Sequence, residues 1–304
     1  MSEIAIDRIR KRDLPRAMEL LLTAFGEELA GRGSDLRSLE RLVRCLLACR
    51  RLPVWILRQT GEVAELWVAR SRGRPVGVLG QMGRSAPYMS GIAVDPAFRG
   101  RGVAQALFRQ VFTDLSARRI PFVRGAVLAD NSPALRLCAK CGLVPYARTS
   151  LQEIPLPATL PPPTAGIAVR PARPGDRRRL WPTSYDESGL RRLLAMEGGF
   201  EASPLRLLGA WSRAWVAERD GAVVGYLGMQ ANRYQAAGTI RTPCLIAEEA
   251  YFPLLRAALQ ELERLGRRKA LVDLLDSQHA LAAGLAKLGA CPDRSWVHLV
   301  RYLP

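Results

Sequence analysis

The feature that most constrains the fold is a loop with two glycines, Gly100 and Gly102, set between an expected strand and an expected helix. The apolar run 92–94 is typical of a strand end, and Pro96 stops it because proline has no N–H for a strand ladder. After the loop, apolar residues recur at helical spacing over 103–115. The first N–H groups of a helix have no partner within it, and glycine lets a ligand approach them. The stretch therefore predicts a phosphate-binding loop.

The spacing of this loop excludes two common phosphate-binding motifs. No Gly-Lys-Ser or Gly-Lys-Thr follows it, and Gln105 stands where the dinucleotide fingerprint needs glycine. An ordinary turn is the structural alternative, since most isolated glycine pairs are turns. The ordered series of strand, proline, arginine, loop and helix favours a ligand site.

A second stretch, residues 131–143, predicts a short helix. Ser132 is the expected cap, Pro133 is expected at the first helical position, and Gly142 ends the helix. With Arg99-x-x-Gly102-x-Ala104, this stretch resembles the two motifs of the GNAT acyltransferase superfamily, which binds acyl-coenzyme A. The resemblance covers residues 3–155. Two positions depart from it: Cys138 replaces the usual tyrosine, and Leu143 replaces phenylalanine.

The resemblance implies an N-acetyltransferase that uses acetyl-coenzyme A as cosubstrate. A primary amine, on a small molecule or a peptide, would attack the thioester directly in a ternary complex. The residues implied in binding coenzyme A are Ile92, Ala93, Val94, Arg99, Gly100, Arg101, Gly102, Val103, Ala104, Asn131 and Ala134.

This reaction includes two proton transfers, and each needs a residue or a water molecule that accepts or donates the proton. A protonated amine cannot attack, so a base must take its proton. The candidates for this base are Glu27, Glu28, Asp35 and Glu65. The leaving thiolate needs an acid, and the thiol of Cys138 is a suitable donor with an unperturbed pKa of about 8.5. The alternative is that Cys138 only packs and water supplies the proton.

The composition of the chain limits the classes of ligand and partner that we expect. The net charge of +17 suits a polyanionic ligand such as coenzyme A; it also suits nucleic acid, but the arginines are scattered, so we favour a solvated basic surface. Six cysteines are too few for a disulfide framework, and Cys138-x-x-Cys141 has no second pair, so we expect no metal.

The sequence shows neither a leader nor a long apolar run, so we expect a cytoplasmic protein with no membrane partner. A non-catalytic acyl-coenzyme A sensor or scaffold is the alternative function.

Length and repetition predict two domains. The 304 residues divide into a first domain over 1–155, a proline-rich linker over 156–166 and a second domain over 167–304. The segment 219–228 resembles 72–80, and Gly225 follows Gly77 by 148 residues. We therefore expect an α/β fold with two tandem GNAT-like domains, each with a mixed sheet, packed as a monomeric pseudo-dimer.

Both domains have a set of expected elements. The strands expected in the first are 4–9, 65–69, 75–82, a strand ending at 94, 121–128 and a closing strand 144–155. Its helices are expected over 13–25, 36–47, 103–115 and 132–141, with a loop over 26–33. In the second domain a strand over 242–247 precedes a helix over 251–262, and Glu248 and Glu249 replace the glycine loop. Because these carboxylates would repel a phosphate, we expect the second domain to be structural or to line the acceptor cleft.

Overall fold

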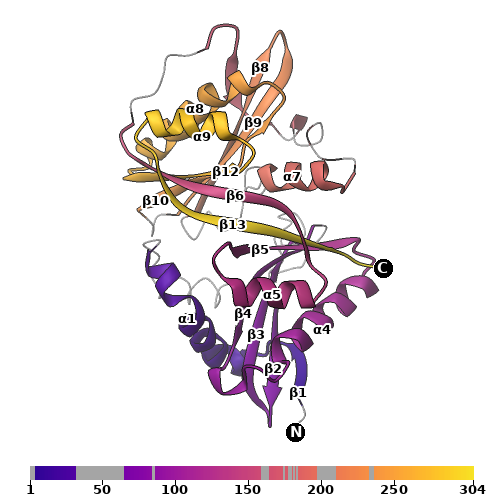
Figure 1. The fold of residues 1–304 in the computed structure, drawn as a ribbon. Coiled ribbons are helices and arrows are strands. Elements are labelled where there is room, and N and C mark those ends of the chain that lie inside the picture. The colour runs from indigo at the N-terminus through magenta and orange to yellow at the C-terminus, as the bar shows by residue number, and fades with distance from the viewer. Residues whose placement is uncertain are drawn as a thin grey trace. The chain divides into compact units, whose positions relative to one another are not determined.

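The computed structural model describes residues 4–31, 65–83, 86–158, 164–173, 175–176, 180, 182, 184–196, 210–232 and 236–304. The chain forms two compact units: unit 1 is Met1–Pro145 with His298–Pro304, and unit 2 is Tyr146–Val297. Each unit has a mixed sheet flanked by helices (Figure 1), which confirms the expected fold class. In the described part of the chain, no helix is long and apolar enough to cross a membrane.

Unit 1 is built on a mixed sheet, in which residues 88–89 pair in parallel with residues 124–125 and the three pairs that precede them in the sheet are antiparallel. In order across the sheet the strands are β1 (Ile4–Arg8), β2 (Glu65–Ser71), β3 (Arg74–Met82), β4 (Tyr88–Val94), β5 (Phe122–Leu128) and the end of β13 (Cys291–Tyr302). The helical segments are η1 (Lys11–Asp13), α1 (Leu14–Gly31), η3 (Pro96–Phe98), α4 (Val103–Ala117) and α5 (Ser132–Lys140).

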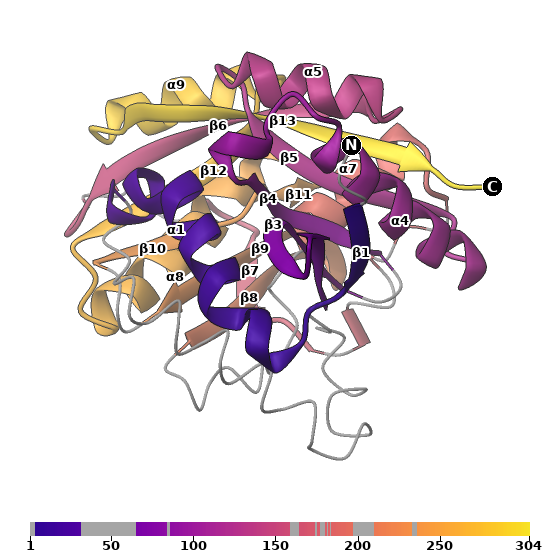
Figure 2. The same ribbon diagram turned by 90° about the horizontal axis from the view of Figure 1, so that it is seen from below.

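The helices α1 and α4 cover opposite faces of this sheet (Figures 1 and 2). Val68, Val78 and Ala93 pack against Leu20 of α1. On the other face, a Cβ added to Gly77 would lie 2.9 Å from Cγ1 of Val103 on α4. Alternate residues of β3 therefore serve two separate apolar contacts, as the period-2 pattern of its sequence predicts.

Unit 2 repeats this plan, and residues 237–240 pair in parallel with residues 269–272. The strands are β6 (Val144–Pro155), β7 (Ala168–Pro171), β8 (Ala210–Arg219), β9 (Ala222–Asn232), β10 (Ala237–Ile240), β11 (Cys244–Leu245), β12 (Lys269–Leu275) and the start of β13. They lie in the order β13-β6-β12-β10-β9-β8-β7, with β11 on β9. The helical segments are α7 (Glu187–Met196), η5 (Glu248–Ala250), α8 (Tyr251–Arg264) and α9 (His279–Lys287).

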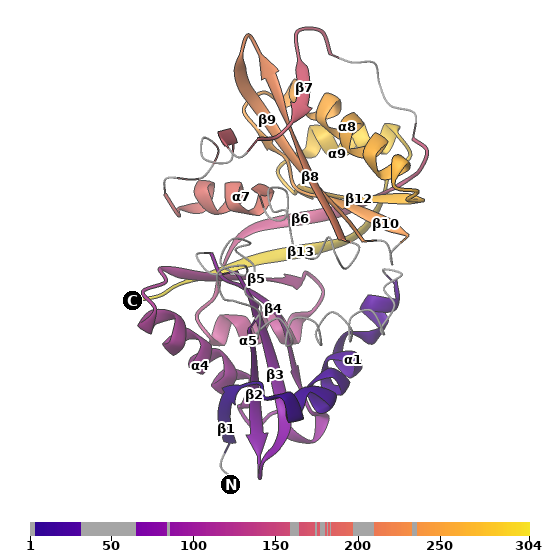
Figure 3. The same cartoon turned by 180° about the vertical axis from the view of Figure 1, so that it is seen from behind.

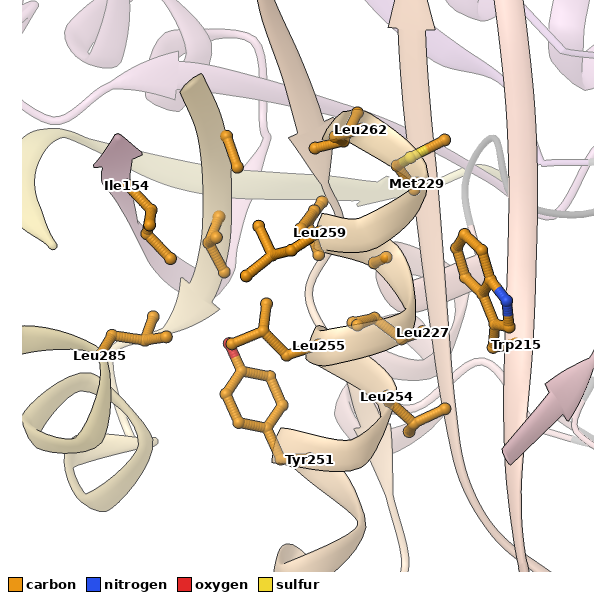
Figure 4. Close-up of a cluster of buried hydrophobic side chains, with 14 of the residues drawn as sticks. Ile154, Trp215, Leu227, Met229, Tyr251, Leu254, Leu255, Leu259, Leu262 and Leu285 are labelled. Carbon is orange, nitrogen blue, oxygen red and sulfur yellow. The ribbon is translucent and has the colours of Figure 1, made fainter. Parts of the chain in front are cut away.

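The core of unit 2 lies between its sheet and α8, while α7 is on the other side of the sheet (Figure 3). Leu254, Leu255 and Leu259 of α8 pack against Met229 and neighbouring apolar side chains (Figure 4). These leucines recur at helical spacing and are almost fully buried, as the apolar pattern of 251–262 predicts.

The repeat between the halves is confirmed at the hairpins. Arg72 and Gly73, between β2 and β3, both have positive φ angles of 49° and 79°. Asp220 and Gly221, between β8 and β9, have φ angles of 50° and 78°. Two-residue turns with two positive φ angles match the twist of the flanking strands, so both halves use the same turn.

The expectation that residues 144–155 close the first sheet is wrong. This strand is β6, and it pairs antiparallel with β12 of unit 2, from Thr149↔Leu275 to Pro155↔Lys269. The place beside β5 is taken by the end of β13, and the N–H of Leu303, the residue after β13, donates to Pro121 O at 2.9 Å. A strand pattern specifies which face is buried and does not specify the neighbouring strand.

Three local expectations also need correction. Helix α1 continues to Gly31 through the expected loop 26–33, because residues 27–30 are good helix formers. Asn131, rather than Ser132, caps α5. The strand expected over 242–247 is replaced by β10, which ends at Ile240, and by the short β11. The helix expected over 36–47 and residues 159–163 of the expected linker lie outside the described residues.

Candidate functional site

The glycine loop joins β4 to α4 as the sequence predicts. Gly100 and Gly102 have φ angles of +72° and +78°, a region that favours glycine. The N–H of Ala106 donates to Gly102 O at 3.0 Å, and this is the first backbone hydrogen bond of α4. Among the described residues, no backbone acceptor meets the N–H groups of 100–105. The loop therefore presents a row of free donors at the positive end of a helix dipole.

Beside this loop, β4 and β5 separate. Their ladder consists of Tyr88↔Arg124 and Met89↔Gly125 only. Further along, residues 91–94 of β4 pair with β3 on one side and have no strand partner on the β5 side in the described chain. This edge is the run 92–94 that was expected to bind an extended arm of a ligand as an added strand.

A β-bulge marks the point of separation. Gly80 pairs with Gly91 and Gln81 pairs with Met89, so Ser90 is the extra residue in β4. Gly91 has a φ angle of +144°, and a Cβ added there would meet the ring of Phe25 at 3.5 Å. A bulge bends its strand and increases the local twist, which turns β4 away from β5.

Asp95 anchors the loop, a role that the sequence reasoning missed. Its Oδ1 accepts from Ala97 N at 3.0 Å, and its backbone N donates to Val76 O at 2.9 Å. Its other carboxylate oxygen is ion-paired with Arg16 of α1. The hydrogen bond from Ala97 N–H and the pairing with Arg16 hold the pKa of Asp95 below its ordinary value, although burial opposes them. The signal was Asp-Pro directly after a strand.

The start of α5 brings Asn131 and Ala134 together, but for a structural purpose. Asn131 Oδ1 accepts from Ala134 N at 3.1 Å, which satisfies one free donor of the helix start. Any contact of these residues with coenzyme A stays a proposal.

Cys138 lies on α5 and is buried, with 7% of its surface exposed. Burial, and to a lesser degree the neighbouring Cys141, raises the pKa of its thiol to about 11. The thiol is therefore neutral at physiological pH. It has a proton to give, and it releases that proton less readily than a free cysteine does.

The candidate bases differ in what surrounds them. Glu65 is held by two arginines, Arg8 at 3.5 Å and Arg118 at 3.6 Å, as a structural ion-pair cluster. Glu27 and Glu28 lie on α1, where the structure describes the backbone at these two positions but not the side chains. Asp35 lies outside the described residues.

Gln81 is a second feature that the sequence reasoning missed. It is 1% exposed, and neither atom of its side-chain amide has a hydrogen-bond partner among the described residues. It faces α4 beside Met89, one strand away from the bulge. A lone glutamine in the apolar strand β3 was the available signal, because buried amides need partners.

Unit 2 differs at the corresponding place. Its helix α8 follows η5, where Glu248 and Glu249 occupy the first turn and Glu249 is ion-paired with Arg219. Where β10 and β12 would separate, Thr242 Oγ1 donates to Asp273 Oδ2 at 3.0 Å. A carboxylate at the helix start and a side-chain bridge between the strands both disfavour a phosphate-bearing ligand.

Comparison with known proteins agrees with this geometry. Residues 36–143 match the model of the acetyltransferase (GNAT) family. A tandem GNAT protein from the clavulanic acid biosynthesis pathway has a similar structure at 18% identity, with a TM-score of 0.61 over 99% of this chain and 98% of that one. A GCN5-related N-acetyltransferase from Sphaerobacter thermophilus is similar at 19% identity, with a TM-score of 0.58 over 98% and 95%. No curated protein matches the sequence significantly.

Proposed function

We propose that this chain, which joins a GNAT-family acetyltransferase sequence to the tandem GNAT fold, transfers an acetyl group from acetyl-coenzyme A to a primary amine. The observation that carries the proposal is in unit 1. A glycine loop with free N–H donors lies at the end of a strand whose edge is open. An acyl-coenzyme A has a pyrophosphate for the first and an amide-bearing arm for the second.

The donor would be held mainly by backbone groups. The N–H groups of Gly100, Arg101, Gly102, Val103 and Ala104 would bind the pyrophosphate. The N–H of Arg99 donates to Pro96 O at 3.3 Å, so Arg99 would contribute through its side chain. The edge formed by Ile92, Ala93 and Val94 would bind the arm. Asn131 and Ala134 would contact the arm from α5. The amine attacks the thioester carbonyl in the ternary complex, the C–S bond breaks, and coenzyme A leaves as a thiolate. Cys138 donates the proton to that thiolate.

A non-catalytic acyl-coenzyme A sensor is the second candidate. The observation that favours it is the burial of Cys138, which raises the pKa of the thiol to about 11 and makes it a weak acid. Turnover of acetyl-coenzyme A against a panel of primary amines, followed by thiol release, separates the two. Turnover above the uncatalysed rate excludes the sensor, and tight binding without turnover excludes the enzyme.

The site is tested by a matched pair of variants, Gly102→Asp and Gly102→Asn. Asparagine and aspartate have the same shape and both tolerate a positive φ, so the pair differs in charge alone. The space beside Gly102 is open, with Gln105 Oε1 at 4.0 Å as the near contact of an added Cβ. We expect Gly102→Asp to weaken coenzyme A binding roughly 10- to 100-fold relative to Gly102→Asn, in calorimetric titration. Equal affinities would refute the assignment of the loop.

A further inference from the structure

A cluster of polar side chains lies on the face of the unit 2 sheet that is turned away from α8. Ser212 of β8 pairs with Gln230 of β9, which pairs with Thr239 of β10. Directly paired residues share a face, and Arg241, two residues after Thr239, reaches the same face. The flanking residue Arg213 points the other way, to an ion pair with Glu261 of α8 at 2.9 Å. We call Ser212, Gln230 and Arg241 the β8–β10 polar cluster.

The cluster has more hydrogen-bond donors than acceptors. Arg241 Nη2 donates to Gln230 Oε1 at 2.9 Å, which uses the amide oxygen. Arg241 Nε and Ser212 Oγ are both buried and have no hydrogen-bond partner among the described residues. Arg241 also has no carboxylate within ion-pair distance in the described chain, whereas Arg213 on the other face has one. The three side chains are half-buried, but a buried donor atom without an acceptor is costly, so these two atoms favour a ligand that supplies an acceptor.

The apolar residues around the β8–β10 polar cluster strengthen its preference for a ligand with acceptor atoms. On the same face, Ala214, Val216 and Tyr226 form a buried cluster on one side, and Leu151, Ala237 and Leu271 form another on the other side. Apolar neighbours lower the local dielectric constant and strengthen each interaction with an ion. The cluster also lies at the carboxyl end of β10, one of the two parallel strands, where ligands of α/β sheets commonly bind.

We propose that the β8–β10 polar cluster of unit 2 binds the carboxylate of a small organic molecule. The guanidinium Nε–H, the hydroxyl of Ser212 and the amide nitrogen of Gln230 are three donors for the two oxygens of one carboxylate. A single arginine neutralises a single negative charge. An inorganic phosphate dianion would leave a net charge buried beside Asp273, which occupies the next row of the same face.

Calorimetric titration of the full chain with four probes tests this site: butyrate, glutamate, inorganic phosphate and 1,5-diaminopentane. Butyrate and glutamate each carry one net negative charge at pH 7. We expect both carboxylates to bind and the diamine and the phosphate not to bind. Arg241→Met should weaken carboxylate binding roughly 10- to 100-fold, the range for a charged hydrogen bond. Arg213→Met, one residue from Ser212 on the opposite face, is the matched control and should bind as the native chain does.

Two further variants protect the test against a folding defect. Ser212→Ala removes an unpartnered hydroxyl, so it should preserve the melting temperature and weaken carboxylate binding several-fold. Arg241→Lys keeps the positive charge but lacks the planar set of N–H donors of the guanidinium. This variant should bind the carboxylates more weakly than the native chain does. Binding should persist in Gly102→Asp, which separates this site from the proposed acyl-donor site. Failure of both carboxylates to bind, preference for phosphate, or unchanged affinity in Arg241→Met would overturn the proposal.

Discussion

At the scale of single residues, burial changes what Cys138 can do. An exposed thiol titrates with a pKa of about 8.5, whereas burial among apolar neighbours raises the pKa of Cys138 to about 11. A proton donor must be protonated, and its contribution is lost as the pH rises through its folded-state pKa. Cys138 therefore keeps its proton over the whole range in which amines become reactive nucleophiles.

We expect Cys138→Ala to lower kcat by roughly 10²- to 10⁴-fold with little change in KM, the range for general acid catalysis. In the native chain, kcat should show no fall near pH 8.5 that Cys138→Ala removes, because the thiol stays neutral there. Steady-state kinetics from pH 7 to pH 10 measure both. A Cys138→Ala variant with native kcat and a lower melting temperature would assign the thiol to packing alone.

At the scale of elements, both units fasten their first helix region to the sheet by an ion pair of the same design. In unit 1, Asp13 accepts from Arg10 N at 2.9 Å and pairs with Arg70 of β2, which also meets Asp7 of β1. In unit 2, Asp176 accepts from Arg173 N at 2.7 Å. The arginine that meets it, Arg170, comes from β7, and the second acid, Glu218, comes from β8. The arginine has changed strands, while the aspartate has stayed.

We expect Asp13→Asn to lower the free energy of unfolding by about 3–5 kcal/mol, because it leaves Arg70 with only the half-exposed Asp7 as a counter-ion. Asp7→Asn is the control, since the side chain of Asp7 is 50% exposed and its pairing should contribute less than about 1 kcal/mol. Urea unfolding at pH 7 measures both. Equal losses in the two variants would contradict the assignment.

The ion pairs of Asp13 and Asp176 predict that the free energy of unfolding decreases at acidic pH. Burial alone would raise the pKa of Asp13, but the hydrogen bonds and charge of Arg70, with the N–H of Arg10, hold it below its ordinary value. The pKa of Asp176 is lowered mainly by its hydrogen bonds from Arg170. A depressed carboxyl pKa stabilises the fold above its unfolded value of about 3.9 and loses that effect as the pH falls through the folded value. The native chain should therefore lose more stability between pH 5 and pH 3 than Asp13→Asn does.

At the scale of the whole molecule, unit 1 is not a continuous stretch of chain, because it consists of Met1–Pro145 and His298–Pro304. The strand that follows α5 in sequence belongs to unit 2 from Tyr146 onward, and the strand that follows α9 ends in unit 1 from His298 onward. In unit 1, Arg301 lies 4.5 Å from the centre of the Phe112 ring and donates to Cys141 O. Leu299 and Val300 are buried there. The last residues of the chain therefore complete the unit that holds the proposed donor site.

We expect a chain that ends at Val297 to unfold unit 1 at a lower temperature and to bind coenzyme A more weakly. Losing the burial of Leu299 and Val300 costs about 3 kcal/mol or more, which corresponds to roughly 6–12 °C for a unit of this size. Differential scanning calorimetry measures the loss, and removal of Pro304 alone is the control. An unchanged melting profile would show that these residues add nothing to unit 1.

The sequence by itself determined the local features of this protein. The apolar periods defined α4, α8 and most strands, and the paired glycines defined the loop before α4, because helix, strand and turn preferences act within a few residues. The repeat of the hairpins followed from Gly77 and Gly225 in the same way.

Only the tertiary structure decided which strand lies beside which, and which polar residues meet. β6 and β13 have ordinary strand patterns, and nothing within them states that each completes the other unit, because strand pairing is set by long-range contacts. Ser212, Gln230 and Arg241 lie on three strands, and each alone is an unremarkable polar residue. They form one group of hydrogen-bond donors only because β8, β9 and β10 bring them to the same face of the sheet.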